Sequence, residues 1–178
     1  MITFKFEDQK VSIPTAWAEV TVGVFSNPDF LSGNSLALLA SLSGIDIGKL
    51  ANTTEDLGPH FARAVKFMKE SPRGWAGKFY NKVKIMGVTC KVPKNIEFET
   101  FGQKVMYGQA LAKHRTNFAT MPYGVAIYLA PQIDPLKWYE RIEEIADAVK
   151  LLPITRVAPI ADFFLTSTKK FRPSGTGS

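Results

Sequence analysis

Two stretches of alternating residues, 79 positions apart, decide the fold: Ile2-Thr-Phe-Lys-Phe-Glu-Asp-Gln-Lys-Val-Ser-Ile13 and Val83-Lys-Ile-Met-Gly-Val-Thr-Cys-Lys-Val92. In both, apolar and polar residues alternate, which places the apolar side chains on one face of a β-strand. The polar turn Glu7-Asp8-Gln9 interrupts the first stretch, and Gly87 interrupts the second. The pattern predicts two β-hairpins, each with one apolar face.

The chain also matches itself around these hairpins when it is shifted by 79 positions without a gap. Four residues are identical in the shifted copy: Lys5 and Lys84, Pro14 and Pro93, Thr21 and Thr100, Gly23 and Gly102. Each copy has a proline that ends the strand, because proline cannot donate to the ladder, and then a threonine that can cap a helix. We interpret the match as an internal duplication; the alternative is two generic hairpins that each precede helices.

Helical patterns fill the rest of both halves. Asn34 or Ser35 can cap an apolar helix over 36–42 that Gly44 ends, and this helix is expected to be central. In the second half, Pro122 precedes an apolar helix, and a helix that starts at Thr100 carries Phe101, Val105, Gly108 and Ala112. Asp134-Pro135 predicts a further helix, one face of which contains Leu136, Tyr139, Ile142, Ile145, Ala146 and Val149.

These patterns predict a mostly helical α+β protein made of two hairpin-plus-helices halves. The first half is expected over residues 1–70 and the second over 82–170. A linker over 71–81 separates them, and 171–178 is expected to be a flexible tail, because it is small and polar.

Composition excludes several classes of protein. The chain has 178 residues, of which 46% are apolar, so it can build a core and is not disordered as a whole. The single cysteine excludes an internal disulfide and a cysteine-based zinc site. No apolar run approaches the roughly 20 residues that a spanning helix needs, and no signal peptide precedes the first hairpin, so we expect no membrane contact.

The residues that could support catalysis have simpler structural interpretations. Cys90 occupies an apolar strand position, aligned with Val11 in the first hairpin, and neither His60 nor His114 has an orienting carboxylate in its own segment. One helical face carries Glu140, Glu143, Glu144 and Asp147, which could hold a divalent ion or supply an acid–base pair, but a solvated face is the preferred interpretation. We therefore predict that the protein is not an enzyme and has no cofactor or metal site.

The charge is unevenly distributed and indicates where a partner binds. The net charge is +6 overall, but residues 63–115 contain 12 basic and 3 acidic groups, whereas residues 1–62 contain 3 and 7. Within the basic segment, aromatic and basic residues alternate, which is typical of interfaces. The candidates for partner binding are Arg73, Trp75, Lys78, Phe79 and Tyr80, with Phe163 and Phe164 as a second set. Two alternatives remain open: a nucleic-acid-binding module that stacks bases on these aromatics, and aromatics that belong to the core.

Several short segments of the sequence resemble those of a family of small tailed-bacteriophage morphogenesis proteins, the tail-assembly chaperones and baseplate-assembly proteins. These segments are Ile13-Pro-Thr-Ala-Trp-Ala-Glu-Val-Thr21, Leu38-Leu-Ala-Ser-Leu-Ser-Gly-Ile45, Asp56-Leu57, Val65-Lys-Phe-Met68, Phe101-Gly-Gln103, Ala126-Ile-Tyr-Leu-Ala-Pro131 and Leu152-Pro-Ile-Thr-Arg-Val-Ala-Pro-Ile-Ala-Asp-Phe-Phe-Leu165. The resemblance spans most of residues 1–168. It implies a non-enzymatic protein that binds other virion proteins in the host cytoplasm, such as tape-measure, tail or baseplate components. A chaperone would leave the finished virion, whereas a baseplate component would remain in it.

Overall fold

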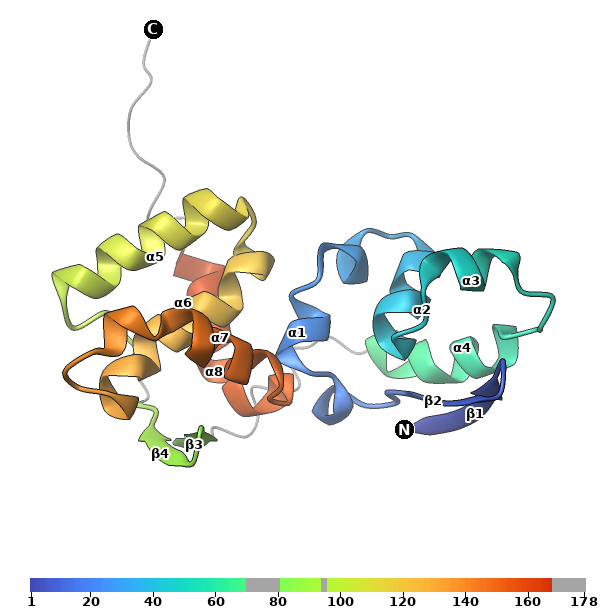
Figure 1. The fold of residues 1–178 in the computed structure, drawn as a ribbon, viewed down its shortest axis with the longest axis horizontal. Helices are drawn as coiled ribbons and strands as arrows, with labels where there is room; N and C mark the ends of the chain where they lie inside the picture. The colour runs from blue at the N-terminus through green and yellow to red at the C-terminus, as the bar shows by residue number, and fades with distance from the viewer. Residues whose placement is uncertain (70–80, 94–95, 168–178) are drawn as a thin grey trace, which may run out of the picture.

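The computed structural model describes residues 1–69, 81–93 and 96–167, and it confirms a mostly helical α+β fold. Each half begins with a hairpin and continues with helices (Figure 1). The elements of the first half are β1 (Ile2–Phe6), β2 (Gln9–Ile13), the 3-10 turn η1 (Trp17–Glu19), α1 (Val22–Phe25), η2 (Pro28–Leu31), α2 (Ser35–Ser43), α3 (Ile47–Asn52), α4 (Gly58–Ala64) and η3 (Val65–Lys69). Those of the second half are β3 (Lys82–Ile85), β4 (Val88–Lys91), α5 (Phe101–His114), α6 (Asn117–Ile133), η5 (Trp138–Glu140), α7 (Ile142–Lys150) and α8 (Ile154–Ser167).

The two hairpins have the same register at the offset of 79 residues. Phe4 pairs with Val11 in the first hairpin, and Val83 pairs with Cys90 at the equivalent place in the second. Both turns contain two residues with positive φ, Glu7 and Asp8 in one and Met86 and Gly87 in the other. Two such residues form the turn whose twist fits a tight hairpin. The predicted hairpins are therefore confirmed in position, register and turn.

The two threonines that the match aligns both cap helices, as predicted. The Thr21 hydroxyl accepts a hydrogen bond from the Val24 N–H (3.3 Å), and the Thr100 hydroxyl accepts one from the Gln103 N–H (3.2 Å). The helices then differ in length. The first stops after four residues because Asn27 and Pro28 begin a new 3-10 turn, whereas the second continues for 14 residues.

The central helix of the protein is α6, not the apolar helix predicted over 36–42. Its residues from Thr120 to Ala130 are buried except for Tyr123. It begins at Asn117 because Thr116 caps it, so Pro122 lies inside the helix and does not precede it. In α2, by contrast, Leu36, Leu38 and Ala40 are only partly buried, although Asn34 and Gly44 bound the helix as predicted.

A short backbone pairing joins the two halves beside α1. The Val22 N–H donates to the Leu152 carbonyl (2.8 Å), and the Ile154 N–H donates to the Val20 carbonyl (2.8 Å). A Cβ added at Gly23 would lie 3.2 Å from the Lys150 carbonyl oxygen, so α1 approaches the end of α7 closely. Figure 1 shows α1 between the two halves. The described residues contain no helix that is both long and apolar enough to span a membrane.

Candidate functional site

Most of the residues predicted to bind a partner cannot be placed. Arg73, Trp75, Lys78, Phe79 and Tyr80 lie outside the described residues. Phe163 lies on α8 and packs edge-on against Phe98, with ring centroids 6.3 Å apart. Phe164 follows it in the same helix. The ring of Phe163 is half-buried, so part of this candidate contributes to the core of the second half.

The cysteine and the two histidines have structural roles. The Cys90 thiol is fully buried in β4, and burial raises its pKa. The imidazole of His60 stacks on Phe4, with ring centroids 4.7 Å apart. The imidazole of His114 stacks on the ring of Tyr123, with ring centroids 4.2 Å apart. Burial, together with the charge of Lys113, lowers the pKa of His114. Burial of a thiol opposes thiolate formation, so Cys90 behaves as a small apolar residue, as predicted.

Three of the four predicted carboxylates lie on α7 and are paired with cations, which agrees with the predicted solvated face; Glu140 lies before this helix, on η5, and is exposed. Glu144 accepts two hydrogen bonds from Arg141 (2.9 and 3.1 Å), and Asp147 accepts one from Lys150 (2.7 Å). Glu143 accepts one from Lys113 on α5 (2.9 Å), and this contact lowers the pKa of the Glu143 carboxyl. Within the described residues, no three histidine, cysteine or acidic side chains are grouped so that they could hold a metal ion.

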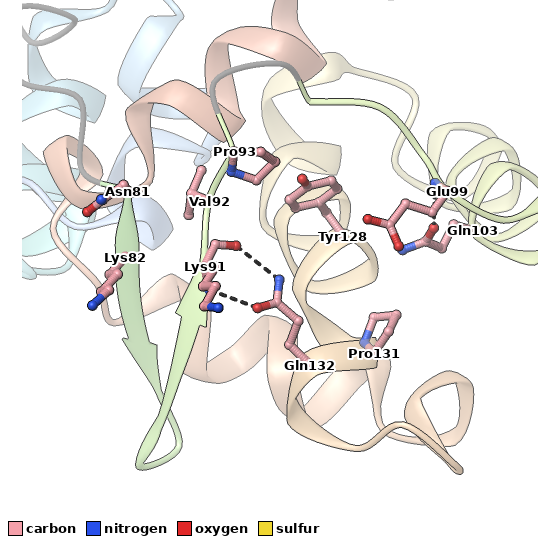
Figure 2. A pocket seen from close by; sticks show the side chains of 10 residues that line it. All are labelled: Asn81, Lys82, Lys91, Val92, Pro93, Glu99, Gln103, Tyr128, Pro131 and Gln132. Atoms are coloured by element: carbon pink, nitrogen blue, oxygen red, sulfur yellow. Dashed lines mark hydrogen bonds between the residues drawn. The ribbon is translucent and has the colours of Figure 1, made fainter.

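A groove lies between the second hairpin and the helices behind it, and we call it the hairpin groove (Figure 2). Its volume is about 580 Å³. The residues that line it are Asn81, Lys82, Lys91, Val92, Pro93, Glu99, Gln103, Tyr128, Pro131 and Gln132. The hairpin, the segment before α5, the start of α5 and the last turns of α6 all contribute to it.

Gln132 fixes the hairpin side of this groove. Its side-chain carbonyl accepts a hydrogen bond from the Lys91 N–H (2.7 Å), and its amide donates to the Lys91 carbonyl (3.0 Å). Both Lys91 groups point away from β3, so the glutamine side chain pairs with the free edge of β4 as a neighbouring strand would. Figure 2 shows these two bonds between β4 and α6.

Gln103 fixes the opposite side. Its side-chain carbonyl accepts hydrogen bonds from the Glu99 and Thr100 N–H groups (3.0 and 3.1 Å), and its amide donates to the Ile127 carbonyl (3.1 Å). The start of α5 is thereby tied to α6. Both glutamines are engaged in holding the scaffold, which leaves Lys82, Lys91 and Glu99 as the charged side chains of the groove.

Three lysines form the outer face of the second hairpin, and we call Lys82, Lys84 and Lys91 the lysine face. All three are exposed, on the side opposite the buried Val83, Ile85 and Cys90. Lys82 lies directly opposite Lys91. None of the three forms an ion pair with a carboxylate of the described residues.

Apolar side chains are exposed at the end of the second half farthest from the first. Phe101 and Leu136 are 82% and 85% exposed, and Val105 and Tyr139 are also exposed; we call these four residues the apolar end surface. They come from the start of α5 and from the connection between α6 and α7, which Figure 1 places at the same end. The two segments meet where the Trp138 ring packs against Gly102.

The exposure of this surface corrects one expectation. Leu136 and Tyr139 do not share a face with Ile142, because Asp134 caps a turn through Leu136 and Lys137, and α7 starts only at Ile142. The residues Phe101, Val105, Gly108 and Ala112 lie on the outer face of α5, since its buried residues are Gln103, Tyr107 and Ala110.

Part of the site could have been found in the sequence. The alternation of apolar and polar residues that predicted the hairpin also places Lys82, Lys84 and Lys91 together on its polar face. The lysine face could therefore be predicted from this two-residue period. The hairpin groove has no such signal, because it depends on how β4 packs on α6.

Comparisons with protein-family models, with curated proteins and with solved structures find no match to this chain.

Proposed function

We propose that the protein is a non-enzymatic assembly protein of a tailed bacteriophage that works by binding other virion proteins. The observation that carries the proposal is the apolar end surface, in which Phe101 and Leu136 are more than four-fifths exposed. Large apolar side chains that gather at one place on a surface are typical of protein-binding sites, because contact with a partner removes them from water.

Two further features support the proposal. Most of the described side chains that were considered for catalysis are engaged in packing or in ion pairs: Cys90 in the core, both histidines in ring stacks, and Glu143, Glu144 and Asp147 with cations. The resemblance to tail-assembly chaperones and baseplate-assembly proteins adds the class of partner, a tape-measure, tail or baseplate protein. Both forms of the proposal, transient chaperone and retained component, use the same surface.

The double variant Phe101→Ser/Leu136→Ser tests the proposal. The protein is co-expressed with the tape-measure, tail and baseplate proteins of its own phage, and the captured partner is quantified. We expect at least a tenfold loss of affinity, since one central anchor contributes more than about 1 kcal/mol. The thermal unfolding midpoint should change little, because substitutions at exposed sites usually alter stability by less than about 0.5 kcal/mol.

Leu151 provides the matched control, because it is 78% exposed but lies between α7 and α8. Leu151→Ser should bind the partner as the unaltered protein does. Equal losses in both variants would contradict the proposal, as would no capture of any of these proteins.

The alternative function is a basic nucleic-acid-binding module. It predicts an affinity that falls steeply as the salt concentration rises, because counterions are released from the phosphates. Gel shifts at two salt concentrations therefore separate the two functions. We expect no shifted band at near-physiological salt.

A further inference from the structure

The lysine face contains an arrangement that does not favour the stability of the hairpin. Lys82 and Lys91 are a directly opposed cross-strand pair, and like charges in such pairs destabilise a sheet. The first hairpin has Thr3 and Ser12 at the equivalent positions, and their hydroxyls are hydrogen-bonded at 2.9 Å. The scaffold can therefore carry a neutral pair at this position, where the second hairpin carries two positive charges. The first hairpin also has an opposed lysine pair, Lys5 and Lys10, but there Lys5 forms an ion pair with Asp8.

The charged pair also borders the hairpin groove. Lys82 and Lys91 both line it, and its other walls include Val92, Pro93 and Pro131. Figure 2 shows the prolines on either side of Tyr128. Met86, at the tip of the same hairpin, is 40% exposed. Methionine is enriched at protein interfaces. The second hairpin thus carries cations and one wall of the groove at its open end, and an exposed methionine at its tip.

We propose that the lysine face and the hairpin groove together bind an acidic polypeptide segment of a partner protein. Carboxylates of the segment pair with Lys82, Lys84 and Lys91, and one apolar side chain enters the groove between Pro93 and Pro131. The argument for this occupant is charge complementarity, since the three cations have no carboxylate partner within the part of the chain that the structure describes. The proposal rests on the proposed function and adds the chemistry of a partner to it.

The site fits a polypeptide better than a nucleic acid. Single strands bind by stacking their bases on aromatic rings, but within the described residues of the second hairpin the lysine face carries no aromatic residue, and Tyr128 is only 6% exposed. Glu99 also lines the groove. A phosphate backbone has a negative charge at every nucleotide and would meet this carboxylate, whereas a polypeptide can place a neutral residue there.

The test measures the binding of fluorescent probes to the full chain. The probes are a short peptide of glutamate and serine with one central leucine, the same peptide with serine in place of the leucine, and a single-stranded oligothymidine of equal charge. The variant Lys82→Thr/Lys91→Ser introduces the residues of the first hairpin. The control Lys10→Ser/Lys69→Ser removes the same charge from two exposed positions elsewhere.

We expect the leucine peptide to bind the unaltered protein and to lose about tenfold in affinity for Lys82→Thr/Lys91→Ser, because two ion pairs with the peptide are lost. The control variant should bind within twofold of the unaltered protein. Replacing the leucine should weaken binding severalfold. The Lys82→Thr/Lys91→Ser variant should melt no lower than the unaltered protein, so its loss of binding would not reflect unfolding.

Three results would overturn the proposal: no binding of the leucine peptide, equal losses in the two variants, or tighter binding of oligothymidine than of the peptide. The first two leave the proposed function standing, because that function depends on Phe101 and Leu136 and is tested with a different variant; the third would favour the alternative, nucleic-acid-binding function. Unchanged capture by Phe101→Ser/Leu136→Ser would contradict the proposed function, and the peptide measurements on the lysine face would show separately whether that site binds.

Discussion

At the scale of single residues, most of the described groups that could react are buried or paired with a partner. Cys90 is the clearest case, because its thiol lies on the inner face of β4 with no exposed surface. Burial raises its pKa above the usual 9.0, since the thiolate would lose its hydration. A group held in this state contributes to packing and does not act as a nucleophile.

Because the Cys90 thiol is buried, we expect it to react slowly with thiol reagents. In the native protein, a thiol reagent should react at least a hundredfold more slowly than with the unfolded chain, and the rate should rise with denaturant as the second hairpin opens. The raised pKa also determines how the free energy of unfolding depends on pH. The unfolded thiol ionises first, so the free energy of unfolding should fall as the pH rises past 9.0. Fast labelling of the native protein at neutral pH would contradict this assignment.

At the scale of elements, the second hairpin is a separate two-stranded unit that α6 holds in place. The Gln132 side chain supplies the two hydrogen bonds that a third strand would have made with Lys91. A two-stranded hairpin alone is marginal in water, so this contact and the burial of Val83 and Ile85 keep it ordered. The hairpin groove exists because this attachment fixes the distance between β4 and α6.

Gln132→Met should loosen the hairpin without filling the groove. Two partly exposed hydrogen bonds are lost, which should cost about 1 kcal/mol and lower the unfolding midpoint by roughly 2–4 °C. The Lys91 amide should exchange with deuterium faster. Gln109→Met is the control, because Gln109 is exposed on α5. Unchanged exchange at Lys91 would show that Gln132 does not hold the hairpin.

Elements with local signals could be predicted from the sequence, and those that depend on tertiary packing could not. The hairpins and the caps at Thr21, Asn34 and Thr100 are set by neighbouring residues, and all were correctly predicted. Leu136 was misplaced because its spacing continues the pattern of α7 across a turn. The buried face of α5 has no clear apolar pattern, because a glutamine, Gln103, takes the place of an apolar residue.

At the scale of the whole molecule, both halves consist of a hairpin followed by helices, but they differ in net charge and in the side chains that they expose. Residues 20–22 and 152–154 join them by backbone hydrogen bonds, so the exposed surfaces of the second half are held on a continuous core. The lysine face and the apolar end surface both belong to the second half. We infer that the first half mainly supports the structure and that the second half binds partners.

The measurement that tests this account most directly is site-specific crosslinking from the apolar end surface. Benzoylphenylalanine replaces Phe101 in one variant and Leu151 in another, and both are made in cells that assemble the phage. The account predicts that Phe101, but not Leu151, forms a light-dependent adduct with a structural protein of the same phage. An adduct with nucleic acid, equal adducts at both positions, or no adduct at Phe101 would contradict it.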